Sequence, residues 1–359
     1  MTQEEANELI QKAIDTTLLA QGGQMNPDQA DKFVDLTVDE SILLKQGCRI
    51  IKTDNPKGEI DKLNIGEPVT EKATENSEST LVYSSTPTQT QGYLYDPTLS
   101  KIEYTCIKTR SAFNITKEAL QSNIEKEELR DTLMRSFAKR MSTDLEYLGI
   151  MGDPTTYAAS FTKVGRLLKA NHGWYRISMG DLAPSPPAAH IIQVGGKNVS
   201  KYLFSKMIKT LPKKYLMAFD SYRFYVSPTI YQNFIEQLSE RSTNLGDAAL
   251  SGKITLTAYG VPIIRVPLIS ESIDCTAGTV EVEDGTFIFL VVPENLIAVF
   301  LRKFDVYWEF KPRADRWENT TYSQTDFQIE NTDAMVVANC VSPSSCEEYN
   351  PCDREIVRI

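Results

Sequence analysis

The sequence predicts an α+β protein in which a folded body carries segments that have no core of their own. Three observations predict this class. A long amphipathic helix is expected near residues 122–148, and the last third of the chain is rich in apolar strands. Residues 66–98, in contrast, are rich in Ser and Thr with little aliphatic content. Because such a stretch cannot bury much apolar area, it is expected to leave the body as a long excursion, with a two-stranded hairpin as one form.

The length and the net charge of the chain limit its number of domains and its kinds of partner. The chain has 359 residues, 41% of them hydrophobic, and a formal net charge of -10. This length allows one large domain or two to three ordinary ones. The acidic balance disfavours tight, sequence-independent binding to nucleic acid, although it is compatible with a container for nucleic acid. The N-terminus lacks the basic head and apolar run of a secretory signal, so folding in the cytoplasm is expected.

Two amphipathic helices are expected at the N-terminus, over residues 2–20 and over residues 27 to about 46, with Gly22 and Gly23 between them. Their apolar residues recur at helical spacing without forming an obvious compact core. The pair is therefore expected to be an arm that buries its apolar face on something else. Strands are expected over residues 47–53 and, after the polar excursion, over residues 101–115.

The long helix is the clearest element of the sequence. Ser122 and Glu125 form a capping-box pattern at its start, and Gly149, Gly152 and Pro154 follow its end. At ~1.5 Å per residue, about 25 helical residues make a strut nearly 40 Å long. Its apolar stripe consists of Leu129, Leu133, Met134, Phe137, Ala138, Met141, Leu145 and Leu148.

Residues 154–200 are expected to be irregular, with a buried aromatic turn at Trp174 and Tyr175. A compact α/β section should follow. It comprises a helix over residues 200–211, a strand over 224–226, a helix from Pro228 to about Ser239 capped by Ser227, and an extended edge segment over 259–267. The last third should contain strands over residues 286–292, 296–301, 305–310, 322–329 and 334–341, the first of them buried on both faces.

No catalytic, cofactor-binding or metal site is predicted. His172 and His190 are the only histidines, and neither belongs to a recognisable nucleophilic triad. The six cysteines include no CxxC pair, so a Cys3His zinc site matches known spacings poorly. Cys340, Cys346 and Cys352 are expected to be free thiols, with disulfides between subunits as the alternative. The basic spots Lys213–Lys214 and Arg313–Arg316 are expected to be ordinary surface, with phosphate contact as the alternative.

The order of these parts resembles the major capsid proteins of tailed double-stranded-DNA phages, which have the Hong Kong 97-like fold. Residues 144–153, 203–215, 224–231 and 257–263 carry the closest local likeness. The resemblance implies an N-terminal arm at 1–58, an extended β-hairpin loop at 59–112 and a peripheral domain at 113–199 with its spine helix and an insertion. It also implies an axial domain at 200–295, return strands of the peripheral domain at 296–342, and a C-terminal tail at 343–359.

The resemblance implies a structural protein, not an enzyme, and no cofactor. Copies would form the pentamers and hexamers of an icosahedral shell around packaged double-stranded DNA, without sequence-specific binding or a membrane. The implied location is the virion capsid, assembled in the host cytoplasm. Separate scaffolding, portal and decoration proteins are the implied further partners, because the segment before the arm is too short for a fused scaffolding domain.

Two other classes remain open. An encapsulin-like bacterial compartment has the same fold and differs in its cargo. A cytosolic enzyme would require a pocket with convergent titratable groups, which the sequence does not indicate.

Overall fold

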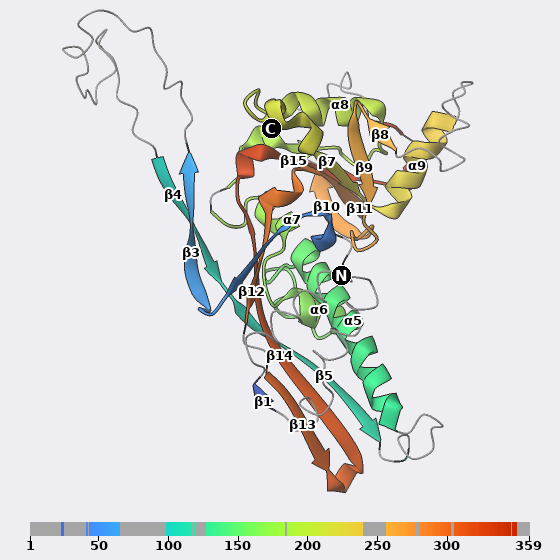
Figure 1. The fold of residues 1–359 in the computed structure, drawn as a ribbon. Helices are drawn as coiled ribbons and strands as arrows, with labels where there is room; N and C mark the ends of the chain where they lie inside the picture. Colours follow the sequence, from blue (N-terminus) through green and yellow to red (C-terminus); the bar gives the residue numbers. More distant parts are fainter. Residues whose placement is uncertain are drawn as a thin grey trace, which may run out of the picture. The chain divides into compact units, whose positions relative to one another are not determined.

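The computed structural model of the chain (Figure 1) describes residues 23–24, 41, 43–64, 98–116, 118, 127–183, 185–239, 256–277, 280–302, 305–345 and 347–349. Several expectations lie outside these residues. They are the helix of residues 2–20, nearly all of the helix of residues 27–46, almost all of the Ser/Thr-rich stretch, and the capping box at Ser122.

The chain divides into two compact units, residues 57–104 and the remainder. The smaller unit is a two-stranded sheet of β3 (Lys57–Asn64) and β4 (Thr98–Thr105). The paired strands β3 and β4 stand at the two ends of the Ser/Thr-rich stretch, which itself lies almost wholly outside the described residues. The two strands pack closely, because a Cβ atom at Gly58 would lie 2.4 Å from the hydroxyl oxygen of Tyr104. An ion pair between Lys101 and Glu59 also joins them.

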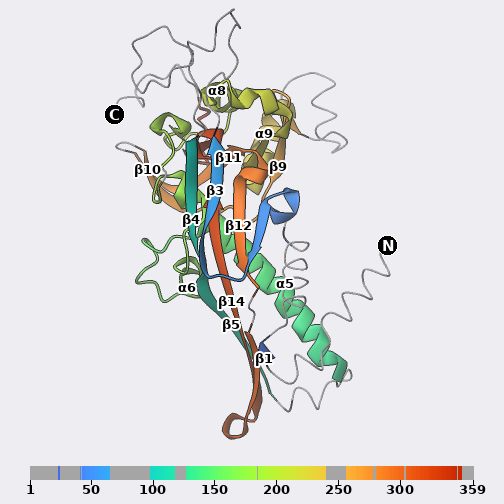
Figure 2. The same cartoon turned by 60° about the vertical axis from the view of Figure 1, so that its left-hand side comes forward.

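The larger unit contains two sheets, and the first is called the long sheet (Figure 2). Its strand order is β1-β13-β14-β12-β2, and β5 pairs with β14. All its pairings are antiparallel except that of β12 with β2. The strands are β1 (Gly23–Gln24), β2 (Arg49–Thr53), β5 (Ile107–Thr116), β12 (Leu296–Leu301), β13 (Asp305–Lys311) and β14 (Arg316–Ile329).

The second sheet, called the buried sheet, has the order β6-β15-β11-β7-β9-β8, and β10 pairs with β11. Phe287, Phe289 and Val291 of β11 belong to one apolar cluster, whereas Ile288 and Leu290 belong to another on the opposite face. Burial on both faces explains the continuous apolar run, as the sequence predicts. The strands are β6 (Ile191–Gln193), β7 (Arg223–Val226), β8 (Thr257–Ala258), β9 (Val261–Arg265), β10 (Ile273–Ala277), β11 (Val280–Val291) and β15 (Met335–Val341).

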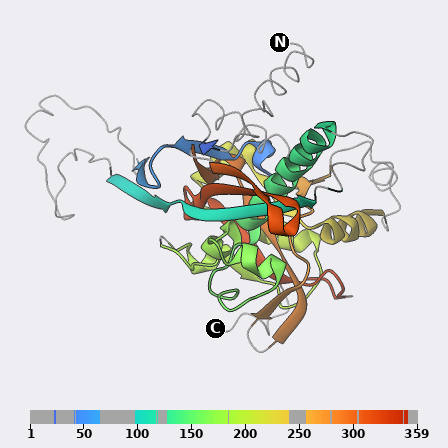
Figure 3. The ribbon, with the colours of Figure 1, turned by 90° about the horizontal axis from the view of Figure 1, so that it is seen from below.

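Helices cover these sheets. The α-helices are α5 (Glu127–Met151), α6 (Lys163–Leu168), α7 (Trp174–Ser178), α8 (Lys201–Thr210) and α9 (Pro228–Ser239). Short 3-10 turns are η1 (Leu44–Gln46), η3 (Ala188–His190), η4 (Tyr215–Ser221), η5 (Pro293–Asn295), η6 (Pro312–Ala314) and η7 (Thr332–Ala334). Side chains of α8 and α9 pack on one face of the buried sheet, and those of α5 and α7 pack in the cluster on the other. In the view from below, α5 lies on one side of β5 and the short helices near residues 163–178 lie on the other (Figure 3).

Most of the expected elements are confirmed. The long helix α5 buries Met141, Leu145 and Leu148 and partly buries Phe137. The side chains of Leu129, Leu133, Met134 and Ala138 lie outside what the structure describes. Helices α8 and α9 follow Ser200 and Ser227, whose hydroxyls accept the backbone N–H groups of Leu203 and Ile230, both at 3.4 Å.

Three expectations are wrong in detail. Residues 154–200 contain α6, α7 and β6 in place of an irregular region, and Trp174 and Tyr175 lie in a helix in place of a turn. Burial of both rings in the core stabilises the short helix that local composition does not predict. The strand of residues 101–115 is interrupted at Cys106, whose backbone N–H donates to the carbonyl of Pro56 at 2.8 Å.

The beginning of the C-terminal tail packs against the body. The backbone N–H of Tyr349 donates to Asn198 O at 3.1 Å, and the Ser200 hydroxyl donates to Tyr349 O at 2.6 Å. Lys206 Nζ lies 2.6 Å from the Tyr349 hydroxyl oxygen. The Tyr349 side chain is 6% exposed and belongs to the apolar cluster under α8. The tail therefore begins as part of the folded unit.

Replacing Tyr349 with Ala should destabilise the subunit by about 3 kcal/mol, because a buried aromatic ring is lost and a cavity remains. Denaturant unfolding of unassembled subunits measures the change. Tyr259→Ala is the matched control, since Tyr259 is 57% exposed, and its effect should be within ~0.5 kcal/mol. Equal effects of the two substitutions would contradict the anchoring role of Tyr349.

Candidate functional site

Helix α7 is attached to the long sheet through Trp174. The indole N–H of Trp174 donates to the carbonyls of Ile297 at 3.2 Å and Gln328 at 3.1 Å, which are register partners on β12 and β14. The ring of Trp174 is fully buried and meets Phe327 edge-on, with 5.3 Å between ring centroids. A buried indole needs an acceptor, and here two strands of one sheet provide it.

The next residue of α7 attaches the helix to the buried sheet. The Tyr175 hydroxyl donates to Asn339 Oδ1 on β15 at 2.8 Å, and its ring stacks on Phe287 of β11 at 4.3 Å. Burial raises the pKa of Tyr175 to about 12, so the hydroxyl keeps its proton and remains a donor. Two consecutive aromatic residues therefore fasten both sheets to one short helix.

A close backbone crossing brings α7 to the end of α5. The Gly173 N–H donates to Gly152 O at 2.8 Å, and the Asp153 N–H donates to Leu168 O at 2.8 Å. A Cβ atom at Gly152 would lie 2.3 Å from Asn171 O, and one at Gly173 would lie 2.5 Å from Gly152 N. Neither position has room for a side chain, so glycine is required at both for steric reasons.

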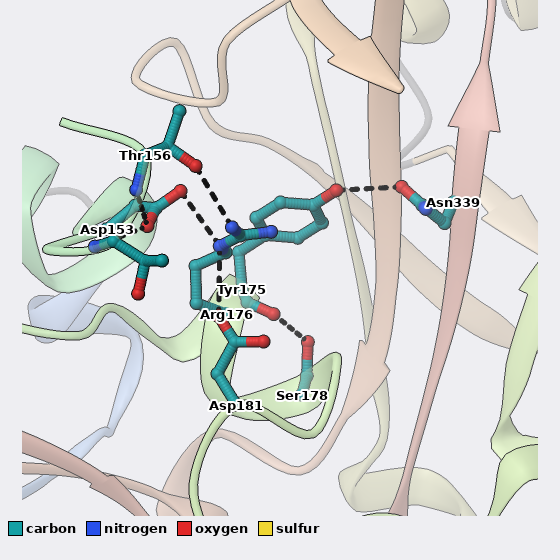
Figure 4. Close-up of polar contacts among 8 residues, drawn as sticks. Asp153, Thr156, Tyr175, Arg176, Ser178, Asp181 and Asn339 are labelled. Atoms are coloured by element: carbon teal, nitrogen blue, oxygen red, sulfur yellow. Dashed lines mark hydrogen bonds and ion pairs between the residues drawn. The ribbon is translucent and has the colours of Figure 1, made fainter. Parts of the chain in front are cut away.

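Ionic contacts join α7 to the residues after α5 at the same crossing (Figure 4). Asp153 Oδ1 accepts the backbone N–H groups of Thr155 at 3.1 Å and Thr156 at 2.9 Å. Arg176 Nε lies 2.9 Å from Asp153 Oδ2 and 3.1 Å from Asp181 Oδ2. Its N–H is not aligned with either oxygen, so these contacts are ion pairs and not directed hydrogen bonds. Burial alone would raise the pKa of the Asp153 carboxyl, but the bonds from Thr156 and Thr155 and the Arg176 charge lower it overall.

The residues just before β2 are part of the core. Leu43 and Leu44 are buried beside the end of α5, and the Leu43 N–H donates to Glu146 Oε1 at 2.5 Å. Gly47 ends the η1 turn with a φ of 106°, and β2 follows in parallel pairing with β12. Burial and the Glu146 charge raise the pKa of the Cys48 thiol to about 12, which keeps it unreactive.

A buried carboxylate organises the beginning of β5. Asp326 accepts the backbone N–H of Thr105 at 2.8 Å and the side-chain amide of Asn171 at 2.8 Å. The Phe327 N–H, at 2.9 Å, donates to the same carboxylate. Burial and the Asp326 charge raise the pKa of the Cys106 thiol to about 12. The point where the chain enters β5 is thus tied to β14 and to the loop before α7.

The structure does not bring the basic and histidine candidates of the sequence together. His172 and His190 each have an Nδ1 atom without a partner, and Lys213, Lys214 and Arg313 are exposed. Arg316 pairs with Glu318 at 2.7 Å. Among the described residues, no group of three or more His, Cys, Asp or Glu could hold a metal ion.

Cys340 is disulfide-bonded, so the expectation of a free thiol there is wrong; Cys346 and Cys352 lie outside the described residues. In the described part of the chain, no helix has the length and apolarity needed to cross a membrane.

Comparisons with known proteins show which proteins the chain resembles in sequence and in fold. No protein-family model matches the chain. A curated relative, YqbE of Bacillus subtilis (strain 168), is provisionally assigned as a prophage capsid protein. It is 27% identical over 329 residues, which cover 91% of this chain and 96% of the relative.

Two solved structures share the fold. A chain of the satellite phage P4 procapsid, determined with its size determination (Sid) protein, gives a TM-score of 0.60 at 17% identity. The likeness covers 95% of this chain and 98% of the procapsid chain. The SrpI encapsulin of Synechococcus elongatus PCC 7942 gives a TM-score of 0.51 at 9% identity, over 86% and 90% of the two chains.

These likenesses show that the chain has the Hong Kong 97-like capsid fold that its sequence predicts. The fold is common to phage shells and encapsulins, whereas the sequence relative is a prophage protein. The sequence likeness to the prophage capsid protein extends over nearly the whole of both chains. A capsid protein as relative implies a structural role.

Replacing Asp153 with Asn should remove a pH-dependent part of the stability. Because the folded-state pKa of Asp153 is lowered, its contribution is present above the ordinary value of 3.8 and is lost as the pH falls through the folded value. The variant should be less stable by about 1–3 kcal/mol at neutral pH, and the difference should shrink between about pH 5 and pH 2.

Unfolding of the unassembled subunit at several pH values measures this difference. The control is Asp54→Asn, which removes an exposed pair with Arg302 at 3.5 Å and should change stability little at any pH. A stability difference for Asp153→Asn that stays constant from neutral to acid pH would contradict the assignment.

Proposed function

We propose that this chain is a phage major capsid protein, and that its copies assemble as hexamers and pentamers into an icosahedral shell that encloses double-stranded DNA. The observation that carries the proposal is the Hong Kong 97-like fold over nearly the whole chain, together with the prophage relative of nearly equal length. A shell protein of this class acts through its surfaces, and its chemistry is that of noncovalent association.

The smaller unit supports a role in assembly. A two-stranded sheet is at best marginally stable by itself in water. The unit of residues 57–104 contains β3 and β4 as its described strands, and exposed charged residues such as Glu59 and Glu103 alternate with Ile60 and Tyr104. A neighbouring subunit that packs against such a hairpin would add contacts that stabilise the two strands.

The assignment of parts follows from the same reasoning. In the proposed scheme, α5, β6 and β12 to β15 lie in the peripheral domain, and β7 to β11 with α8 and α9 lie in the axial domain. The hairpin of β3 and β4 is the extended loop. The segment before Leu43 is the arm, rooted where Leu43 and Leu44 join the core. Scaffolding, portal and decoration proteins are proposed further partners.

DNA is the proposed cargo because the relative is a prophage capsid protein and not a compartment protein. The net charge of -10 fits a wall that encloses DNA without binding it tightly. Scattered exposed cations would add little sequence-independent affinity to such a wall.

Expression of the full chain, followed by a sizing column and negative-stain electron microscopy, should yield closed particles or hexameric rings. Particles purified from a host that carries the complete phage genome should then protect DNA from added nuclease. Particles that hold a protein cargo and no DNA would overturn the phage assignment in favour of a compartment. A stable small dimer in place of particles, in the presence of the other phage proteins, would overturn the shell function itself.

A further inference from the structure

An exposed apolar pair stands at the start of α6. Phe161 is 83% exposed and Val164 is 52% exposed. The Ser160 and Thr162 hydroxyls that flank Phe161 lie 3.0 Å apart, and Thr162 Oγ1 accepts the Gly165 N–H at 3.0 Å as the helix cap. A Cβ atom at Gly165 would lie 2.0 Å from Ser160 Oγ, so this turn is closely packed. The packed turn holds Phe161 in the solvent, where a large aromatic side chain is unfavourable without a partner.

The same surface carries a row of cations. Lys163, Arg166 and Lys169 recur every three residues, and all three are exposed. None of their charged side-chain groups forms an ion pair or hydrogen bond within the part of the chain that the structure describes. Residues 160–170 contain no Asp or Glu. In a chain of net charge -10, three adjacent unpaired cations form a local surface of opposite sign.

We propose that this α6 surface, defined by Phe161, Lys163, Val164, Arg166 and Lys169, binds the N-terminal segment of residues 2–20 from a neighbouring copy. The proposal rests on the proposed shell function and names one contact within the shell. Residues 2–20 contain four acids against one base, Lys12. The acids are Glu4, Glu5, Glu8 and Asp15, and the apolar residues Leu9, Ile10, Ala13, Ile14 and Leu18 share the expected helical face.

A neighbouring copy is favoured over the same chain by the position of β1. The N-terminal segment leads directly into β1, where Gly23 and Gln24 pair with Val306 and Asp305 of β13. Figures 1 and 2 show β1 and α6 on opposite sides of β14. β1, to which the segment is joined in sequence, therefore lies across the sheet from the α6 surface of its own copy.

A protein segment is favoured over nucleic acid by the apolar pair. Phosphate groups would match the three cations, but Phe161 and Val164 match no feature of a duplex backbone. An acidic amphipathic helix matches both properties of the surface, since apolar contacts supply affinity and complementary charge supplies orientation.

Charge exchange in the full chain tests the proposal. The triple variant Lys163→Glu, Arg166→Glu, Lys169→Glu should lower the yield of closed particles about tenfold or more through like-charge repulsion. Adding Glu4→Lys, Glu5→Lys, Glu8→Lys to that variant should restore the yield. The matched control is Lys209→Glu, Lys213→Glu, Arg313→Glu, which changes the net charge equally at three exposed cations elsewhere. Normal yield from the α6 variant, or no recovery on charge exchange, would overturn the proposal.

Cross-linking gives a readout that does not depend on charge variants folding. A photoreactive phenylalanine analogue at position 161, in shells assembled from mixed light and heavy-isotope chains, should cross-link to residues 2–20 of another copy. Cross-links to DNA, to another protein, to another segment of this chain or within one copy would overturn the proposal, as would shells without a cross-link to residues 2–20. Failure of unmodified chains to form any shell would instead contradict the proposed function.

Discussion

The attachment of α7 to both sheets is the constraint on which the rest of the larger unit depends. Trp174 bonds to β12 and β14, whereas Tyr175 bonds to β15 and stacks on β11. The crossing of Gly152 and Gly173 then ties this helix to the end of α5. A long helix and two sheets are thus fixed to one another by a five-residue element. A shell subunit needs such rigidity, since errors in its geometry would be multiplied over every contact with its neighbours.

This body contrasts with the parts proposed to act between subunits. The β3–β4 hairpin is a two-stranded unit of its own, and among the described residues before β2, Leu43, Leu44 and Cys48 belong to the core. Apolar surface on α6 remains exposed in the single chain. The fold itself is shared by phage shells and by an encapsulin, so it does not specify the cargo. The relation to a prophage protein is what separates the two assignments.

Much of the fold could be predicted because local signals agree with tertiary packing. Ser200 and Ser227 cap helices as expected, and the apolar run 286–292 is buried on both faces. The region around Trp174 could not be predicted, since its short helix depends on contacts with strands more than 120 residues away. The requirement for glycine at positions 152 and 173 likewise comes from a backbone crossing that sequence spacing does not reveal. The sequence places Tyr349 in a tail, because no residue near it in the chain indicates its contact with α8.

Hydrogen–deuterium exchange on unassembled subunits and on shells tests the central claim most directly. The claim is that a rigid body is already complete in the single chain, while the hairpin is completed by neighbours. Amides of β12, β14 and β15 should be protected equally in both forms, and amides of β3 and β4 should gain protection only in shells. Equal protection of β3 and β4 in the two forms would contradict the account, because the hairpin would then need no neighbour.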